Sequence, residues 1–205
     1  MKKPSAHYTQ TIQSEYVLFE EIEDNTLLID CEIDCQFGRK QIQEVKFENC
    51  RFSTAEYKQT EFLDVIFQKC DLSNFNFNKS IFYRCEFQTC KLLGTQFIGS
   101  TCKDVSWLNC LMNYAILSEG KMNQVCFRES QLEEAFFHNC KFQQTSFELC
   151  NLQLADFSES KLKGVDLSSS DFVDIKLTPS LAKGLSIRFD QAPAIAAMLG
   201  VTIKN

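Results

Sequence analysis

Side chains that could act as acids, bases or nucleophiles are plentiful in this sequence, but their spacing forms no catalytic set. The chain has 27 Asp and Glu residues and only two histidines, His7 and His138. A hydrolase needs a base beside its nucleophile, yet we expect His138 on the outside of the fold and His7 in a mobile N-terminal stretch. Adjacent carboxylates such as Glu133 and Glu134 could act as an acid–base pair only in a cleft that shifts their pKa values, and we expect no cleft in this fold. With no glycine-rich phosphate loop either, the sequence predicts no enzyme and no cofactor.

The 11 cysteines include no C-x-x-C pair, and the two histidines lie far apart. A zinc site needs ligands clustered at short spacings, so no metal is predicted. No apolar stretch follows the two N-terminal lysines, which argues against a secretory signal and for a reduced, cytoplasmic protein. Four of the cysteines, Cys50, Cys70, Cys90 and Cys110, recur every 20 residues, and we call them the cysteine column. We interpret them as small buried side chains rather than as a redox system.

The composition favours a large core and argues against two classes of partner. Apolar residues make up 44% of the sequence, with 19 phenylalanines but only 7 glycines and 3 prolines. No run of 18 apolar residues occurs, so no membrane-spanning helix is expected. The net charge of −6 argues against direct nucleic-acid binding, which usually needs a basic surface.

The main signal is an internal repeat of five residues. Every fifth residue from Ile42 to Leu177 is apolar, and most of these are Phe or Leu. This period is neither the 3.6 residues of a helix nor the two of a flat strand. From Val45 to Ile175, the residue two positions earlier is small in every unit except at Phe75 and Ile175. Each unit therefore turns one large and one small side chain inward, and stacked units share a core that no single unit has.

A second period of 20 residues lies on top of the first. The cysteine column is one of four columns of small positions, each with its own residue types. Four units per coil predict an all-β, four-sided solenoid whose coils rise by about 4.8 Å each. The units from Ile42 to Leu177 make seven such coils, which is a rod of roughly 34 Å.

The positions of the five-residue repeat, here called its frame, divide the chain into segments 1–41, 42–179 and 180–205. In the first segment it continues only loosely, through Val17, Ile22, Leu27, Glu32 and Phe37. Because Glu32 is costly to bury, we expect imperfect coils with a bulge or loop near residues 30–36. In the middle of the rod, Cys102, Trp107, Met112 and Met122 replace Phe or Leu at inward positions. This indicates either a bend between two half-rods or simple tolerance of these side chains in the core.

The tail 180–205 reads as a closing element. Leu185–Phe189 is a candidate strand, and a helix is expected after Asp190 as N-cap, ending at Gly200. Its apolar stripe either covers the rod end as a lid or forms a dimer interface, and the dimer is the favoured interpretation because an open β-helix end invites aggregation. The stripe contains Ile195, Met198, Leu199 and Val201.

The alternation of small residue, polar residue, Phe or Leu, and two polar residues resembles the pentapeptide-repeat family. Residues 155–159 (ADFSE) and 165–169 (VDLSS) are clean examples. The resemblance implies a right-handed quadrilateral β-helix. With its irregular middle and its closing segment, the chain resembles more narrowly the quinolone-resistance (Qnr-type) members.

The Qnr-type resemblance implies a homodimer joined through the C-terminal stripe. It also implies a rod that mimics duplex DNA, binds DNA gyrase or topoisomerase IV, and protects them from quinolones. The frame is unbroken from Ile42 to Leu177, so the chain is closer to the loop-poor members than to those with two loops interrupting the rod. A scaffold for another partner, or an immunity protein, remains the alternative.

Mimicry of DNA requires a line of acidic groups. Residues 1–38 carry a net charge of −6, so the remainder sums to zero. In the C-terminal half, one side is nevertheless acidic, while Lys121, Lys141, Lys161 and Lys163 lie on the opposite side. We expect the acidic side to be the partner-binding face, an ordinary solvated surface being the alternative. Its candidate residues are Glu129, Glu133, Glu134, Asp156, Glu159, Asp166, Asp171 and Asp174.

Overall fold

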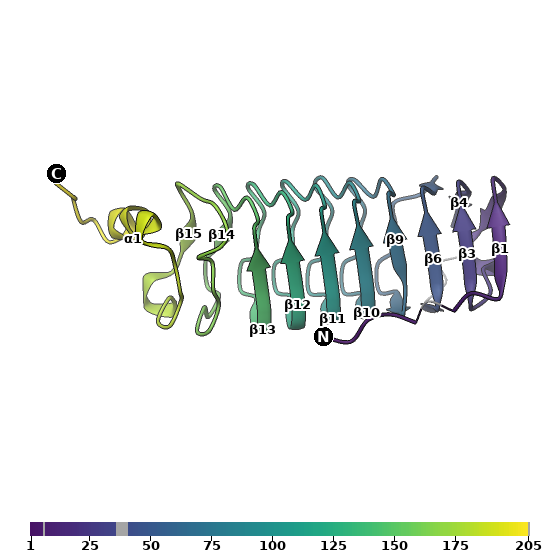
Figure 1. The fold of residues 1–205 in the computed structure, drawn as a ribbon, viewed down its shortest axis with the longest axis horizontal. Coiled ribbons are helices and arrows are strands. Elements are labelled where there is room, and N and C mark those ends of the chain that lie inside the picture. Colours follow the sequence, from purple (N-terminus) through teal and green to yellow (C-terminus); the bar gives the residue numbers. More distant parts are fainter. Residues whose placement is uncertain (6, 36–40, 205) are drawn as a thin grey trace.

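The computed structural model describes residues 1–5, 7–35 and 41–204 as a rod of stacked parallel strands (Figure 1). The main sheet has the order β1-β3-β6-β9-β10-β11-β12-β13, and β5 and β8 also join it. Its strands are β1 (Gln10–Gln13), β3 (Thr26–Ile29), β5 (Gln41–Gln43), β6 (Val45–Glu48), β8 (Glu61–Leu63), β9 (Ile66–Gln68), β10 (Ile81–Gln88), β11 (Thr101–Leu108), β12 (Lys121–Arg128) and β13 (Lys141–Glu148).

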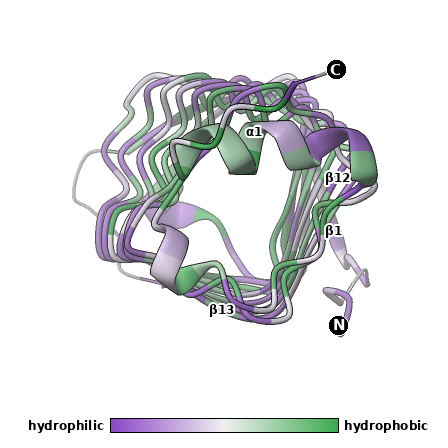
Figure 2. Cartoon of the chain, turned by 90° about the vertical axis from the view of Figure 1, so that its left-hand side faces the viewer, coloured by the Kyte–Doolittle hydropathy of each residue, from purple (hydrophilic) through white to green (hydrophobic). Residues whose placement is uncertain are grey.

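The 20-residue period is the register of this sheet. Phe62 of β8 pairs with Phe82 of β10, and Phe87 of β10 pairs with Trp107 of β11. Seen end-on, the coils superimpose as a four-sided outline (Figure 2). The fold is a right-handed quadrilateral β-helix, as the family resemblance implies, and its four sides are those that the repeat predicts.

We number the four faces by their inward residues. The first face contains Phe62 and Phe82, the second Phe67 and Phe87, the third Leu72 and Leu92, and the fourth Phe77 and Phe97. Strands β10 to β13 run along the first and second faces. The third and fourth faces are joined mainly by single bridges such as Asn151↔Asp171 and Phe136↔Asp156, together with the short strands β14 (Asp156–Phe157) and β15 (Lys176–Leu177).

The corners between faces depend on left-handed backbone. The residue two positions after most inward side chains has φ near +55°, as at Asn49 and Asn109. Asn tolerates this conformation, and glycine adopts it freely, as at Gly94 (φ +64°). Each left-handed residue turns the chain from one face to the next.

The N-terminal coils keep the expected frame at Val17, which pairs with Ile33, and at the buried Ile22, and the frame then shifts by one residue. Leu28 and Ile33 are the buried inward residues, whereas Glu32 is exposed. Strand β4 (Glu32–Asp34) pairs in register with β2 (Tyr16–Leu18) and β7 (Arg51–Phe52). The expected bulge is therefore absent from residues 30–35; residue 36 and the frame position Phe37 lie outside the described residues.

The middle of the rod does not bend. The pairing offset stays at 20 residues from β10 through β13. Trp107 stacks between Phe87 and Phe127, with ring centroids 5.4 and 4.7 Å away, and Met112 is fully buried. The core simply accommodates these side chains, because stacked neighbours of similar shape leave no gap.

The N-terminal stretch is held against the rod rather than mobile. The backbone N–H of Lys2 donates to Asp104 at 2.6 Å, and that of Ser5 donates to Asp64 at 3.1 Å. Both carboxylates lie where the first and second faces meet, and Arg84 also binds Asp64 through its Nε at 2.6 Å. Residues 1–5 thus cross several coils (Figure 1).

The tail differs from expectation in two ways. Residues 185–189 form no strand; only Ser186 makes a bridge, to Asp166. Helix α1 (Ala192–Met198) begins later than an Asp190 cap would place it, because the 3-10 helix η3 (Phe189–Gln191) occupies that position. Two further 3-10 helices are η1 (Phe19–Glu21) and η2 (Pro179–Leu181). Helix α1 lies across the rod end (Figure 2).

Candidate functional site

The eight carboxylates of the expected binding face, here called the acidic stripe, lie on three consecutive coils but spread over three faces. Glu133 and Glu134 lie on the third face, and the backbone N–H of Glu134 donates to the carbonyl of Gln153 on the next coil at 2.9 Å. Leu154 in turn donates to the carbonyl of Asp174 at 2.8 Å. Glu134 and Asp174 therefore share one column, two coils apart, with Leu154 between them.

Several stripe carboxylates are occupied by partners in the same chain. Arg188 Nη2 donates to Asp171 at 3.0 Å, and the Thr178 hydroxyl donates to Glu159 at 3.1 Å. Asp166 accepts the backbone N–H of Ser168 at 2.8 Å, and hydrogen bonding from Ser168 lowers the pKa of this carboxyl. Asp156 likewise accepts the N–H of Ser158 at 2.8 Å.

The remaining stripe carboxylates are more open to a partner. Among the described residues, Glu134 and Asp174 have no side-chain hydrogen bond or ion pair. Glu133 accepts a long hydrogen bond from Asn113 at 3.5 Å, and Glu129 is exposed. Glu129, Glu133, Glu134 and Asp174 are therefore the stripe residues whose charge faces solvent with the least internal compensation.

The first face of the same coils is basic. Lys121 of β12 pairs in register with Lys141 of β13, although like charges directly opposite one another are mildly destabilising. Two shallow hollows lie along this face, one of about 410 Å³ beside Lys103 and Lys121 and one of about 440 Å³ beside Lys161. This lysine face consists of Lys103, Lys121, Lys141, Lys161, Lys163 and Lys183.

Charge is therefore segregated around the C-terminal half of the rod. The stripe carboxylates occupy the second, third and fourth faces, and most lysines occupy the first, while Lys176 lies on the fourth face and Arg128 on the second. The segregation arises because residues 20 apart in sequence lie in one column, so a residue type that recurs at this spacing gathers on one face.

The predicted dimer stripe is divided between two environments. Ile195 and Met198 are partly buried and pack against the core of their own rod. Leu199 and Val201 are exposed, as are Ile203 and, at 95% of its surface, Phe189. The tail thus covers the rod end and also presents apolar side chains outward. Phe189 was not among the predicted interface residues, because the sequence pattern places it in a candidate strand.

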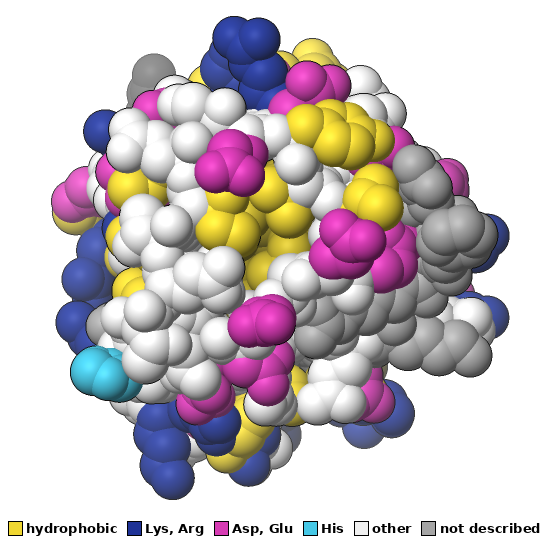
Figure 3. All heavy atoms as spheres, turned by 90° about the vertical axis from the view of Figure 1, so that its right-hand side faces the viewer, with side chains coloured by type: hydrophobic (Ala, Val, Ile, Leu, Met, Phe, Trp, Pro, Cys, Tyr) yellow, Lys and Arg dark blue, Asp and Glu magenta, His cyan; other side chains and the backbone are white. Residues whose placement is uncertain are grey.

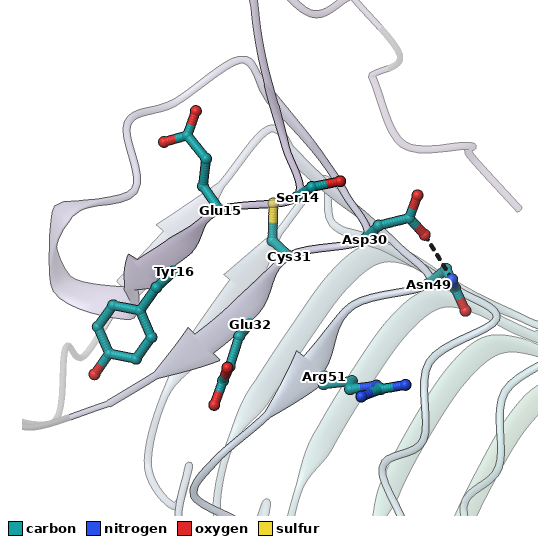
Figure 4. A pocket seen from close by; sticks show the side chains of 8 residues that line it. All are labelled: Ser14, Glu15, Tyr16, Asp30, Cys31, Glu32, Asn49 and Arg51. Atoms are coloured by element: carbon teal, nitrogen blue, oxygen red, sulfur yellow. Dashed lines mark hydrogen bonds between the residues drawn. The ribbon is translucent and has the colours of Figure 1, made fainter.

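The opposite end of the rod carries a polar pocket of about 440 Å³ (Figure 4). The side chains of Glu15 and Glu32 point away from each other, and Asp30 accepts a hydrogen bond from Asn49 at 2.6 Å. The thiol of Cys31 donates to the carbonyls of Ile12 and Ile29. No acid–base pair or activated nucleophile arises from this arrangement, and the residues that line the pocket include no histidine.

Seen end-on at the β1 end, apolar side chains are visible at the centre with Asp and Glu side chains around them (Figure 3). Within the described ranges, no three His, Cys, Asp or Glu side chains are grouped as metal ligands. None of the helices in this part of the chain has the length and apolar character that a bilayer crossing requires.

The cysteines are packing residues. All 11 are free, and only Cys35 is less than fully buried. The column members donate to the backbone of the preceding coil, as Cys90 does to the Phe67 carbonyl at 3.3 Å. Burial raises the pKa of the Cys85 thiol to about 12, so it stays protonated and unreactive.

The repeat geometry agrees with a known sequence family. The sequence model described as a pentapeptide repeat region matches residues 60–137 and 118–187, which together span more than half of the chain. The chain belongs to the pentapeptide-repeat family. No curated protein sequence matches it.

Several solved structures of this family are similar to the chain. The plasmid-mediated fluoroquinolone resistance protein QnrB1 is 17% identical, with 96% of this chain and 100% of that chain covered and a TM-score of 0.48. HetL, a pentapeptide repeat protein involved in heterocyst differentiation regulation in Nostoc, is 12% identical over 90% of this chain and 88% of that one, with a TM-score of 0.36. A pentapeptide repeat protein from the Arabidopsis thaliana thylakoid lumen is 19% identical over 46% and 66%, with a TM-score of 0.43.

Proposed function

We propose that this chain is a non-enzymatic binding protein that docks its acidic side on DNA gyrase or topoisomerase IV in place of DNA and protects the enzyme from quinolones. The observation that carries the proposal is the segregation of charge around the rod. DNA-binding surfaces are positively charged. In the C-terminal half of the rod, the stripe carboxylates lie on the second, third and fourth faces and most lysines lie on the first face, so the rod can approach such a surface in one orientation. The partner itself is taken from the resemblance of the sequence to the Qnr-type members. Such a protein acts in the cytoplasm and does not bind nucleic acid directly.

The stripe residues least occupied by internal partners define the test. Glu133→Lys, Glu134→Lys and Asp174→Lys reverse charge without breaking an ion pair or a strong hydrogen bond. Asp171 is unsuitable, because its reversal would also disrupt the Arg188 contact that holds the tail. The matched control is Lys121→Gln, Lys141→Gln and Lys161→Gln on the lysine face.

The measurement is gyrase supercoiling in the presence of a quinolone, with increasing amounts of the protein. The proposal expects rescue by the original chain and by the lysine-face control, and loss of rescue in the charge-reversed variant. Absence of rescue by the original chain, together with no effect on gyrase or topoisomerase IV alone, would contradict the proposal.

We also propose that the protein is a homodimer joined through its C-terminal segment. Leu199 and Val201 are exposed, while Ile195 and Met198 hold the helix on its own rod. Leu199→Asp with Val201→Asp should therefore convert a dimer to a folded monomer, measured by light scattering with circular dichroism as the folding control. A monomeric original chain would refute this proposal.

A further inference from the structure

At one outward position of the repeat, apolar residues replace the usual polar ones in the middle of the rod. On the third and fourth faces, the residue just before the inward side chain is polar in most coils. The exceptions are Leu111 on the third face and Ile116 and Phe136 on the fourth. The polar equivalents are Asp71, Lys91, Gln131, Asn151 and Asp171 on the third face, and Glu56, Asn76, Gln96, Asp156 and Lys176 on the fourth.

The polar residues at this position stabilise the turn that follows. Asp71, Asn151 and Asp156 each accept the backbone N–H two residues ahead, at 3.1, 3.1 and 2.8 Å. Leu111, Ile116 and Phe136 cannot accept such a hydrogen bond, and they also expose apolar surface. Where a sequence departs from a local rule that its neighbours obey, the departure often marks a functional site.

These three residues and Tyr114 lie on two adjacent coils, on either side of the corner between the third and fourth faces, and we call them the mid-rod patch. Ile116 and Phe136 are directly stacked as bridge partners. Tyr114 lies between Leu111 and Ile116, at the corner where the third face meets the fourth. Its φ of +62° is left-handed, a conformation that is uncommon for a bulky side chain. Leu111, Tyr114 and Phe136 are 42%, 52% and 39% exposed.

The rim of the mid-rod patch is acidic on the C-terminal side. The Tyr114 backbone N–H donates to the Glu133 carbonyl at 3.0 Å, which places Glu133 and Glu134 on the coil next to Tyr114. Asp156 is the bridge partner of Phe136. On the N-terminal side, Lys91 is within 3.9 Å of Asp71 and adds no net charge with it.

An exposed apolar centre with aromatic side chains and a charged rim is the usual composition of a protein–protein interface. The acidic rim selects a partner whose own rim is basic, since opposite potentials favour encounter and fix orientation. A second copy of this chain would have to bring its lysine face to the patch, but the apolar surface in the two shallow hollows of that face is small in extent and is bordered by lysines.

We propose that the mid-rod patch is the apolar anchor with which the rod grips the positively charged DNA-binding surface of a type II topoisomerase. This inference rests on the proposed function and deepens it: the acidic stripe orients the rod, and Leu111, Tyr114, Ile116 and Phe136 provide the affinity that charge alone does not. Unlike a DNA duplex, the protein would then stay bound when salt screens its carboxylates.

The test restores the residue type that the other coils use. A triple variant with Leu111→Asn, Ile116→Asn and Phe136→Asn should keep the fold, because Asn at this position supports the turn. The matched control is Ile81→Gln, which makes the same kind of change on the first face, where Gln41 and Glu61 occupy the equivalent position. Tyr114→Asn tests the corner separately and also relieves its left-handed backbone.

Binding to purified gyrase and topoisomerase IV is measured as a dissociation constant over a range of salt concentrations. The triple variant should bind about 100-fold more weakly, with the slope of affinity against salt unchanged. Glu133→Gln with Glu134→Gln should instead flatten that slope, and Ile81→Gln should bind like the original chain. Thermal unfolding should show the triple variant to be at least as stable as the original.

The two proposals fail in different ways. If the original chain binds and the triple variant binds within about threefold of it, the anchor is refuted and the proposed function stands. If the original chain binds neither enzyme, the proposed function fails and the anchor fails with it. If the triple variant instead changes the mass measured by light scattering, the patch is an interface between copies and the proposal is overturned.

Discussion

Arg188 donates from Nη2 to the carboxylate of Asp171 at 3.0 Å, and so ties the C-terminal tail to the last complete coil. The same guanidinium binds Asp190 at 2.7 Å through Nε and the carbonyl of Ser168 at 3.1 Å. One side chain thus joins the helical cap to two points of the last coil, beyond the end of the main sheet.

Replacement of Arg188 by alanine should loosen the cap without unfolding the rod. The contacts are solvent-exposed, so the loss should appear as local opening rather than global destabilisation. We expect faster amide hydrogen exchange over residues 185–198 and unchanged exchange in β10 to β13. Arg128→Ala, which breaks a comparable exposed pair with Glu148, is the control and should leave the tail protected. If the tail of the Arg188 variant exchanges as slowly as that of the original chain, apolar packing alone holds the tail.

Trp107 should be far more sensitive to truncation than to aromatic replacement. Trp107→Ala removes a fully buried side chain between Phe87 and Phe127 and should cost about 3–5 kcal/mol. Within the described part of the chain, the buried indole N–H of Trp107 has no hydrogen-bond partner. Trp107→Phe should therefore cost much less, about 1 kcal/mol, because removing an unpaired donor offsets part of the lost volume. Urea unfolding followed by circular dichroism checks both, and equal costs would contradict this account.

Leu149 is an exposed side chain held in left-handed backbone, with φ of +54°. Substitution by Asn, which tolerates that conformation, should stabilise the protein by about 1 kcal/mol. The opposite change is Gly94→Ala, where an added Cβ would also meet the Asn74 Oδ1 at 2.7 Å, and it should be destabilising. The comparison is made by thermal unfolding at one pH, and loss of stability in Leu149→Asn would disprove the strain.

Glu148 should make stability depend on pH in the acid range. Burial by itself raises the pKa of Glu148, but hydrogen bonds from Arg128 and Ser146 outweigh it and hold the pKa below its ordinary value of 4.5. The folded state therefore holds this proton less tightly, so the contribution is complete above about pH 4.5 and disappears as pH falls through the lowered pKa. Glu148→Gln should be less stable than the original chain at pH 7, and the gap should close below pH 4.5. A gap that is constant with pH would refute the assignment.

The thiols should react in an order set by burial. Cys35 is partly exposed and the other ten are buried. A thiol reagent should therefore label Cys35 first in the native protein, and Cys35→Ser should abolish that fast phase. After denaturation without reductant, all 11 thiols should react; a smaller number would contradict the packing role of the cysteine column.

Much of this architecture can be predicted from sequence because a solenoid repeats its contacts. An inward residue such as Phe87 meets its counterparts 20 positions away on either side, so a five-residue pattern directly reports the burial of each position. The β-helix, its four faces and the burial of Trp107 follow from that pattern. The mid-rod patch also has a sequence signal, because Leu111, Ile116 and Phe136 are apolar at a position where the other coils have polar residues. Inward positions alone do not reveal it.

The structure of the two ends could not be predicted from the sequence, because the five-residue pattern does not continue there. The N-terminal frame shifts by one residue, since burying Ile33 and exposing Glu32 costs less than the reverse. Residues 1–5 lie along the rod because buried Asp104 and Asp64 accept their backbone N–H groups. Likewise, which stripe carboxylates are engaged, such as Asp171 by Arg188, depends on side chains that only three-dimensional packing brings together. The periodic core follows from the repeat because each position meets its own counterpart in the next coil. The contacts that close the two ends occur once each, so they follow only from the three-dimensional packing.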